Sequence, residues 1–326
     1  MPKNILVTGV TGFVGSAVSA RLATDARYAV VKSSRSPGAV LGGTQLRFDL
    51  DNPDPNLDLS DIDCIVHAAA RVHVLAREDH DHAMKAFRTA NVRGTAALAE
   101  AAAQCGVRRF IFVSSIKVNG EHTLPGAPFT ADDMPAPVDP YAISKYEAER
   151  FLLGLAKRSK MEVVIIRPPL IYGPGVKANY YKMMEWLVKG IPLPLGAVEN
   201  ARSFVSLDNL IDLILLCIDH PSAHENVFMV SDGMDLSTPQ LLQKLGVGLG
   251  ARARLLTVPI PLLRLAMAVV GKREAFNKIC SSLQVDISAT TSRLGWLPPV
   301  SLEKNIEAVT NDFLQRSRSK PPVDQS

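Results

Sequence analysis

The fold is decided close to the amino terminus, by the stretch Asn4-Ile5-Leu6-Val7-Thr8-Gly9-Val10-Thr11-Gly12-Phe13-Val14-Gly15. A short apolar run that ends in glycine is typical of a buried parallel strand. The glycines that follow are spaced G-x-x-G-x-x-G and lead into helix-forming residues. Glycines in such a turn let the backbone approach a pyrophosphate, whose charge suits a helix N-terminus. The stretch therefore predicts a dinucleotide-binding turn between a strand and a helix.

Further strand-like runs follow this turn and alternate with helix-forming segments. The expected strands are residues 29–31, 45–48, 64–68, 110–113 and 163–166, and the expected long helices are residues 80–104 and 140–157. This alternation predicts an α/β fold with a doubly wound parallel sheet. Proline and glycine clusters after Arg167 indicate a change of organisation. We expect a nucleotide-binding domain formed by residues 1–169, to which residues 203–224 return. Residues 170–202 and 225–315 are expected to form a smaller α/β substrate-binding lobe, and residues 316–326 a frayed tail.

Composition narrows the class of protein. The chain has 326 residues, is 47% apolar and carries a formal charge of +4. That apolar content excludes a disordered chain, and the scattered basic residues favour no nucleic-acid partner. The four cysteines form no C-x-x-C pair, so no metal site is expected and buried thiols in a reducing, cytoplasmic setting are favoured. No apolar run reaches the length of a transmembrane segment.

The end of the second strand bears on the choice of cofactor. An acidic residue there would bind the ribose hydroxyls of NAD, whereas a basic residue would accept the 2′-phosphate of NADP. The chain has Ser34 and Arg35 and no acid at this point. Because a guanidinium pairs well with phosphate, NADP(H) is the preferred prediction, with NAD(H) left open. Asp49, after the third strand, is placed to receive the adenine amino group.

The stretch Tyr141-Ala142-Ile143-Ser144-Lys145 carries the expected chemistry. Residues four apart share one face of a helix, so Tyr141 and Lys145 lie together. A neighbouring ammonium stabilises a phenolate, and the pair is then expected to act as a general acid and base at neutral pH. Ser115, at the end of the fifth strand, would polarise a substrate oxygen beside the tyrosine.

Glycine turn, strand-end serine and Tyr-x-x-x-Lys, in this order, resemble the extended short-chain dehydrogenase/reductases of the nucleotide-sugar epimerase/dehydratase group. The resemblance also covers Asn91-Val92-Arg93-Gly94-Thr95 and the run from Arg202 to Leu210. It implies a Rossmann domain, a UDP-sugar substrate and a homodimer formed through the helices at 80–104 and 140–157. It further implies that Asn179 and Arg202 meet the UDP diphosphate, and that Arg71 and His73 line the sugar pocket.

The expected site residues fall into three groups. The catalytic residues are Ser115, Tyr141 and Lys145. The cofactor-binding residues are Gly9, Thr11, Gly12, Phe13, Val14, Gly15, Ser34, Arg35, Asp49, Leu50, Ala68, Ala69, Ala70, Asn91, Val113, Tyr141, Lys145 and Pro168. The substrate-binding residues are Arg71, His73, Ser115, Lys117, Asn179 and Arg202.

Departures from the family pattern reduce the number of reactions that this chain is expected to catalyse. Sugar 4,6-dehydratases of this group have an Asp-Glu pair directly after the catalytic threonine, whereas this chain has Ile116 and Lys117. Dehydration is therefore not expected. The favoured reaction is NADPH-dependent reduction of a UDP-4-keto-6-deoxy-N-acetylhexosamine at C4, to a UDP-N-acetylquinovosamine-type product for bacterial surface polysaccharide (O-antigen). The alternatives are a UDP-glucose or UDP-N-acetylglucosamine 4-epimerase that retains NAD, and a catalytically silent nucleotide-binding protein on the same fold.

Overall fold

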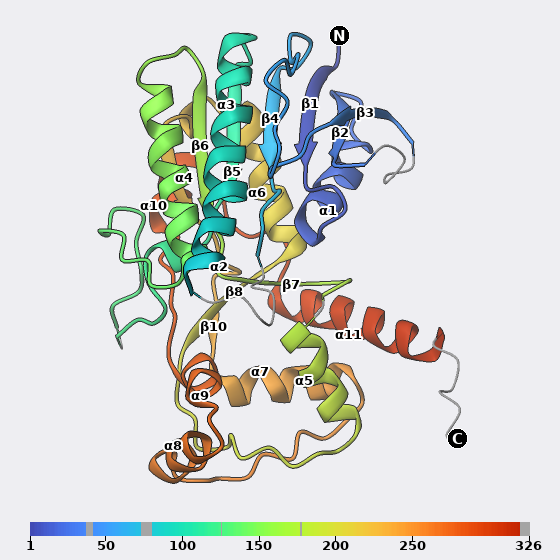
Figure 1. Ribbon diagram of the computed structural model, residues 1–326. Helices are drawn as coiled ribbons and strands as arrows, with labels where there is room; N and C mark the ends of the chain where they lie inside the picture. Colours follow the sequence, from blue (N-terminus) through green and yellow to red (C-terminus); the bar gives the residue numbers. More distant parts are fainter. Residues whose placement is uncertain (37–41, 73–79, 125, 177, 320–326) are drawn as a thin grey trace, which may run out of the picture.

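The computed structural model describes the chain outside residues 37–41, 73–79, 125, 177 and 320–326. Its largest element is a parallel sheet of seven strands in the order β3-β2-β1-β4-β5-β6-β9 (Figure 1). The strands are β1 (Lys3–Thr8), β2 (Tyr28–Ser34), β3 (Thr44–Arg47), β4 (Cys64–His67), β5 (Arg109–Val113), β6 (Glu162–Arg167) and β9 (Asn226–Met229). From β1 the strands are added first toward one edge of the sheet and then, starting with β4, toward the other edge. Doubly wound sheets bind dinucleotides at the point between β1 and β4 where this change occurs. The predicted fold class is confirmed.

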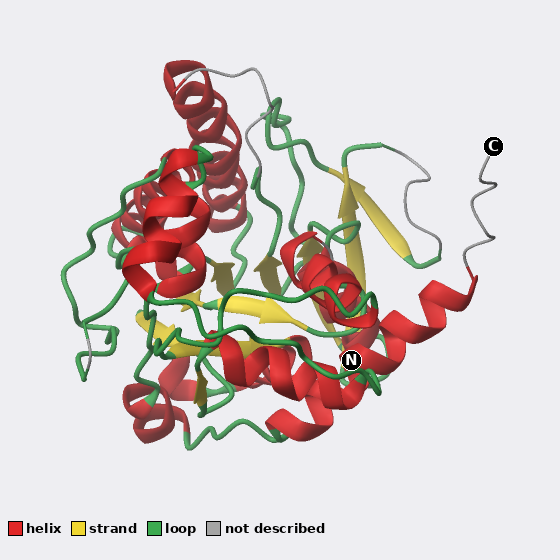
Figure 2. Ribbon diagram, turned by 90° about the horizontal axis from the view of Figure 1, so that it is seen from below, coloured by secondary structure: helices red, strands yellow, loops and turns green. Residues whose placement is uncertain are grey.

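The sheet is covered on both faces, and its sequence reflects this. Along β1, Ile5 and Val7 belong to one buried cluster and Leu6 to the other, so every strand residue in this stretch must be apolar. One face is covered by α1 (Phe13–Leu22) and α6 (Leu207–Asp219), and the other by α3 (Thr95–Gln104) and α4 (Pro140–Ala156). Figure 2 shows helices on both sides of the strands when the molecule is viewed from below.

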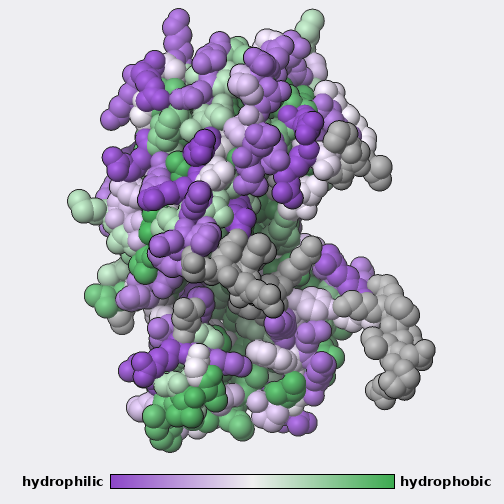
Figure 3. Space-filling model, in the orientation of Figure 1, coloured by the Kyte–Doolittle hydropathy of each residue, from purple (hydrophilic) through white to green (hydrophobic). Residues whose placement is uncertain are grey.

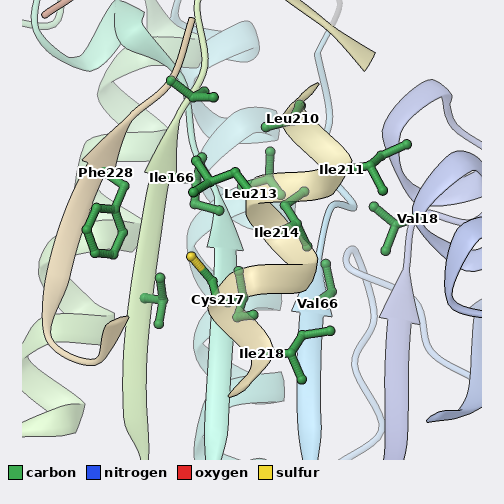
Figure 4. Close-up of a cluster of buried hydrophobic side chains, with 14 of the residues drawn as sticks. Val18, Val66, Ile166, Leu210, Ile211, Leu213, Ile214, Cys217, Ile218 and Phe228 are labelled. Carbon is green, nitrogen blue, oxygen red and sulfur yellow. The ribbon is translucent and has the colours of Figure 1, made fainter. Parts of the chain in front are cut away.

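Helix α6 is a long-range return to this sheet. Figure 4 shows its residues Leu210, Leu213, Ile214 and Cys217 beside strand residues such as Val66 and Ile166. Ser206 caps its first turn by accepting from the amide of Asn209, which fixes where the helix begins. A chain that leaves the sheet after β6 and returns as α6 places two distant segments in one core.

The long helix expected at residues 80–104 consists of three pieces. They are α2 (His80–Phe87), a π-helical turn η1 (Arg88–Gly94) and α3. A Cβ on Gly94 would lie 2.4 Å from the backbone oxygen of Leu50, so glycine permits close contact between this turn and the loop after β3. π-Helical turns often occur at functional sites, and this one contributes Asn91 to the region described below.

A second, smaller group of elements lies at the opposite end of the molecule (Figure 1). A three-stranded sheet β10-β8-β7 packs near α5, α7 and α11 around a separate apolar cluster. The bounds are β7 (Leu170–Tyr172), β8 (Arg202–Ser206), β10 (Asp235–Leu236), α5 (Ala178–Val188), α7 (Thr238–Gly248) and α11 (Leu302–Ser319). The remaining elements are the 3-10 turns η2 (Ile116–Val118) and η3 (Pro221–Ala223), and the helices α8 (Ile260–Val269), α9 (Arg273–Cys280) and α10 (Ser288–Leu294).

Three details differ from the expected division of the chain. Strand β9 pairs with β6 in the main sheet, although residues from 225 onwards were assigned to the smaller lobe. Trp296, just after α10, is buried in the cluster around α6 and donates from Nε1 to Asp212 at 2.9 Å. Helix α11 continues to Ser319, past the predicted start of a frayed tail at 316. The rest of that tail, residues 320–326, lies outside the described residues.

Candidate functional site

The glycine turn connects β1 directly to the start of α1. The amide of Gly12 donates to the carbonyl oxygen of Gly9 at 2.8 Å, which closes the turn. Gly12 is the N-cap of α1 and no side chain caps this helix, so amide groups of the first turn are open to a ligand. An uncapped helix N-terminus with adjacent glycines suits a phosphate group.

At two of the glycines, neighbouring backbone segments approach more closely than any side chain would permit. A Cβ on Gly15 would lie 2.3 Å from the carbonyl oxygen of Gly9, and a Cβ on Gly9 would lie 2.8 Å from the amide nitrogen of Ala69. Gly9 also has a φ of +71°, in the left-handed region. These contacts bring the loops after β1 and β4 together beneath one cavity. The close backbone packing leaves the uncapped N-terminus of α1 facing the cavity, so the residues present fit a dinucleotide.

The cavity has a volume of about 680 Å³ and lies at the carboxyl ends of the strands. Most of the predicted cofactor residues line it, together with Arg71 from the predicted substrate group. The lining residues that were predicted are Gly9, Thr11, Gly12, Phe13, Val14, Gly15, Ser34, Arg35, Asp49, Leu50, Ala68, Ala69, Ala70, Arg71, Val113, Tyr141 and Lys145. Ser34 and Arg35, at the end of β2, are part of the wall, and Ser34 donates to the carbonyl oxygen of Ser36 at 2.8 Å.

Sequence reasoning missed several residues of this wall. They are Thr8, Ser33, Ser36, Phe48, Asp51, Val72, Ala90, Ser114 and Ile171. Most of them neighbour a predicted residue at a strand end, so a wider window at each end would have included them. Ile171 lies in β7, and no local pattern connects it to the cofactor region.

Tyr141 and Lys145 lie in the first turns of α4, whose position is fixed by a well-defined start. Asp139 is the N-cap and accepts from the amide of Ala142 at 2.7 Å, and Pro140 occupies the first helical position. Both features favour a helix that begins at this point. The Tyr-x-x-x-Lys spacing therefore presents both side chains to the cavity.

The electrostatic state of Tyr141 differs from the sequence expectation. The pKa of Tyr141 is raised to about 12. Burial is the largest cause, the negative charge of Asp139 acts in the same direction, and a hydrogen bond with Ser115 acts in the opposite one. The sequence predicted the opposite direction, a pKa of Tyr141 lowered by the neighbouring ammonium of Lys145. Removing the phenol from water disfavours its charged form, and this effect dominates.

Lys145 is a buried cation above an aromatic ring. It is 2% exposed, and its Nζ lies 3.9 Å from the centroid of the Phe112 ring. Burial lowers the pKa of Lys145 to about 7, and the negative charge of Glu149 acts against this shift. Glu149 lies one turn further along α4 and is itself held by two hydrogen bonds from Arg167, at 2.6 and 3.0 Å. Lys145 is therefore close to the point at which it changes charge at neutral pH.

The two serines at the end of β5 have different surroundings. Ser115 begins the turn η2, where its Oγ accepts from the amide of Lys117 at 3.3 Å, and it interacts with Tyr141. Ser114 lines the cavity, and its buried Oγ has no hydrogen-bond partner among the described residues. An unpaired buried hydroxyl is costly, so Ser114 is available to a ligand group.

Asn91 connects the cavity wall to α4. Its Oδ1 accepts from the amide of Arg71 at 2.8 Å, and its Nδ2 donates to the carbonyl oxygen of Arg71 and to Ser144 Oγ, each at 3.0 Å. Asn91 is not among the residues that line the cavity. It holds the backbone after β4 in register with the catalytic helix, which is a positioning task.

His67 forms a buried polar link beneath the glycine turn. Its two ring nitrogens lie 2.8 Å from Thr8 Oγ1 and 3.0 Å from Thr95 Oγ1, and Thr8 in turn accepts from the amide of Ala69. Burial lowers the pKa of His67 to about 3, and the nearby charge of Lys145 lowers it as well. The ring is therefore neutral at physiological pH and acts as a structural connector between β1, β4 and α3.

Three other predicted residues, all described by the structure, do not line the cavity: Lys117, Arg202 and Pro168. Lys117 pairs with the carboxylate of Asp139, and its Nζ is 3.9 Å from Glu121. Arg202 donates to the carbonyl oxygen of Ser281 at 2.8 Å. The carbonyl of Pro168 accepts from the amide of Ile116 at 2.9 Å, which ties β6 to the catalytic loop. Asn179 lies in α5, but its side chain and all of His73 lie outside what the structure describes.

Metal chemistry has no obvious site within the part of the chain that the structure describes. No group of three or more His, Cys, Asp or Glu side chains gathers there. Within the same residues, no helix is both long and apolar enough to cross a bilayer. The four cysteines are free thiols.

A doubly wound sheet, an uncapped glycine turn and a Tyr–Lys pair on one cavity define a dinucleotide-dependent enzyme of the extended short-chain dehydrogenase/reductase class. Comparison with known proteins gives the family. Residues 5–231 match the NAD dependent epimerase/dehydratase family, and the chain belongs to it.

One curated relative and two solved structures illustrate the likeness. The chain is 45% identical over 320 residues to a UDP-glucose 4-epimerase of Vibrio cholerae, covering 97% of each chain. It matches a UDP-glucuronic acid 4-epimerase of Bacillus cereus in complex with NAD, with a TM-score of 0.77, 22% identity and coverage of 96% and 99%. A UDP-glucose 4-epimerase of Thermotoga maritima with UDP-glucose gives a TM-score of 0.77 at 23% identity, with the same coverage. The two structures support the fold.

Proposed function

We propose that this protein is a UDP-hexose 4-epimerase that uses NAD. The observation that carries the proposal is the 45% identity, along almost the whole of both chains, to a relative described as a UDP-glucose 4-epimerase. The cavity adds support, because Tyr141 and Lys145 line the same space as the glycine turn. The order of the two expected reactions is therefore reversed, and the reductase becomes the second candidate.

The residues of the site suit a reversible oxidation at C4 of the sugar. Bound NAD would supply a hydride acceptor that later returns the hydride to the other face of the ring. Tyr141 would take the proton of the C4 hydroxyl and return it after the sugar turns. Ser115 would hold the C4 oxygen, because its hydroxyl already interacts with Tyr141. Lys145 would stabilise the phenolate as an ammonium group.

The positions after Ser115 argue against dehydration. Ile116 is buried among apolar residues, and Lys117 is committed to an ion pair with Asp139. A carboxylate pair for acid and base work at C5 and C6 is therefore replaced by an apolar residue and a paired cation. This supports chemistry confined to C4.

The second candidate is NADPH-dependent reduction of a UDP-4-keto-6-deoxy-N-acetylhexosamine, the reaction first favoured by the sequence. It is supported by Ser34 and Arg35, which line the cavity at the end of β2, where an NAD-specific site would have an acid. Arg35 is exposed and would pair with a 2′-phosphate. The two candidates differ in whether the reduced cofactor is consumed.

One experiment separates the candidates. Purified protein is denatured, and any released nucleotide is identified by mass spectrometry. The native protein is then incubated with UDP-glucose or UDP-N-acetylglucosamine, and separately with NADPH and a 4-keto UDP-sugar. An epimerase releases NAD and equilibrates the C4 epimers without net consumption. Stoichiometric loss of NADPH with no epimerisation would overturn the proposal and favour the reductase.

The cofactor preference has its own matched variants. Arg35→Ala removes the candidate phosphate partner, whereas Arg47→Ala removes an exposed arginine at the end of β3 that does not line the cavity. If NADP is used, only Arg35→Ala weakens its binding relative to NAD. Equal effects of the two substitutions would show that Arg35 does not choose the cofactor. The predicted homodimer and cytoplasmic location stay predictions, and sedimentation velocity measures the first of these.

A further inference from the structure

Helix α8 presents an apolar stripe to solvent. Leu262, Leu265 and Val269 are spaced by three and four residues, so they share one face, and they are 58%, 62% and 81% exposed. Only Leu263 of this helix is buried. Figure 3 shows hydrophobic surface at this end of the molecule, where Figure 1 places α8. An exposed apolar stripe of this kind indicates an interaction surface.

The segment of the chain that carries the stripe is strongly basic. Residues 252–280, here called the hairpin segment, contain the basic residues Arg252, Arg254, Arg264, Lys272, Arg273 and Lys278. The only acidic residue in the sequence of this segment is Glu274, so the segment carries a net charge of +5. The whole chain carries +4, so the remainder is slightly negative. The net positive charge of this protein is therefore concentrated in the segment that also carries the apolar stripe.

The hairpin segment has a defined shape. Helix α8 packs against α9, and the guanidinium of Arg264 lies 5.5 Å from the centroid of the Phe276 ring. The amide of Lys272 donates to the carbonyl oxygen of Met267 at 2.7 Å, which closes the connection between the helices. The segment lies at the end of the molecule opposite the seven-stranded sheet (Figure 1). Contact there leaves the dinucleotide cavity uncovered.

We infer that the hairpin segment docks the enzyme on an anionic lipid bilayer. An amphipathic helix with basic residues lies in the interface, with its apolar face among the acyl chains and its cations near the headgroups. The ten residues of α8 are too few to span the membrane, so the attachment is peripheral. A second copy of this chain is a poorer partner, because two segments of charge +5 would repel each other.

The test is sedimentation of the full-length protein with vesicles of phosphatidylcholine, with and without phosphatidylglycerol. Wild-type protein is expected to bind the anionic vesicles and to dissociate as salt rises, because exposed charges are screened. A Leu262→Ser, Leu265→Ser, Val269→Ser variant is expected to bind at least about tenfold more weakly, since each residue loses its contact with the acyl chains. Circular dichroism checks that the variant is folded.

A control variant removes a comparable amount of exposed apolar surface elsewhere. Leu124, Met134 and Leu297 are comparably exposed and lie outside the hairpin segment. Their triple serine variant should bind as the wild type does. A Lys272→Gln, Arg273→Gln variant should lose binding to anionic vesicles while keeping the apolar stripe.

Two results would overturn the inference. One is wild-type protein that fails to sediment with anionic vesicles at low salt. The other is equal binding by the stripe variant and its control. If the stripe variant instead converts an oligomer into a monomer in sedimentation velocity, and vesicles have no effect, the stripe is a contact between copies of the chain.

Discussion

Glu149 affects both the stability of the protein, through its ion pair with Arg167, and the pKa of Lys145. It is 2% exposed as a side chain and accepts two hydrogen bonds from Arg167, which is 4% exposed. Arg167 also donates to Asn119 Oδ1 at 2.9 Å. Replacing Glu149 by Gln leaves the shape intact but removes the charge opposite a buried guanidinium.

The expected cost of Glu149→Gln is large. Removing one partner of a buried ion pair costs about 3–5 kcal/mol, because the other charge stays buried without compensation. Glutamine still offers one acceptor oxygen, so we expect the lower end, about 3 kcal/mol. The same substitution at Glu147, two residues earlier, breaks an exposed pair with Arg88. Exposed pairs contribute at most about 1 kcal/mol, so Glu147→Gln is the matched control.

The assay is denaturant unfolding followed by circular dichroism, with both variants measured beside the wild type. A second readout concerns the site. Because Glu149 opposes the lowering of the Lys145 pKa, Glu149→Gln should move that pKa to lower values, and the corresponding limb of the pH profile of kcat/KM should shift with it. Glu147→Gln should leave the profile in place. Equal and small losses of stability for the two variants, with unchanged profiles, would refute the reasoning.

Three further predictions follow from individual contacts. Tyr141→Phe should lower turnover by about 10²- to 10⁴-fold by removing the general acid and base, while Tyr146→Phe on the same helix should not, as steady-state kinetics will measure. Gly15→Ala should abolish nucleotide binding in fluorescence titration because its Cβ would lie 2.3 Å from the Gly9 oxygen, whereas Gly154→Ala, with no atom nearer than 3.7 Å, should be neutral or stabilising. The pKa of His67 is about 3 in the folded protein and about 6.5 in the unfolded chain, so the unfolded state binds the proton first as the pH falls. The free energy of unfolding of the wild type should therefore fall by roughly 1.4 kcal/mol for each pH unit across this window. His67→Asn should show a shallower loss of stability in acid titration.

The sheet was predictable because its signal is local. Each buried strand contains a short apolar run, and in β5 the residues from Phe110 to Val113 are all apolar because both faces of the strand are covered. Strand β9 was not recognised as part of this sheet. Its four residues follow a long excursion of the chain, and pairing with β6 is a long-range contact that no local pattern records.

The members of the site were predictable from spacing, but their electrostatic state was not. Tyr-x-x-x-Lys gives a shared helical face, yet the pKa of each side chain depends on its burial and on a nearby carboxylate, Asp139 for Tyr141 and Glu149 for Lys145. Asn91 illustrates the same limit. Its sequence context suggested cofactor contact, whereas its three hydrogen bonds to Arg71 and Ser144 make it a positioning residue, because the π-helical turn aims it at the backbone.

The protonation state of the free site bears on which reaction it performs. With a pKa of about 12, Tyr141 holds its proton at neutral pH, so it is ready to donate to a C4 carbonyl as a reductase requires. An epimerase must first remove a proton from the C4 hydroxyl. Ionising Tyr141 at pH 7 costs roughly 7 kcal/mol, at about 1.4 kcal/mol for each pH unit. Lys145, with a pKa of about 7, cannot supply that stabilisation fully while it is half neutral. A higher pKa of Lys145 would therefore favour epimerisation more than reduction, because only epimerisation begins with the phenolate of Tyr141.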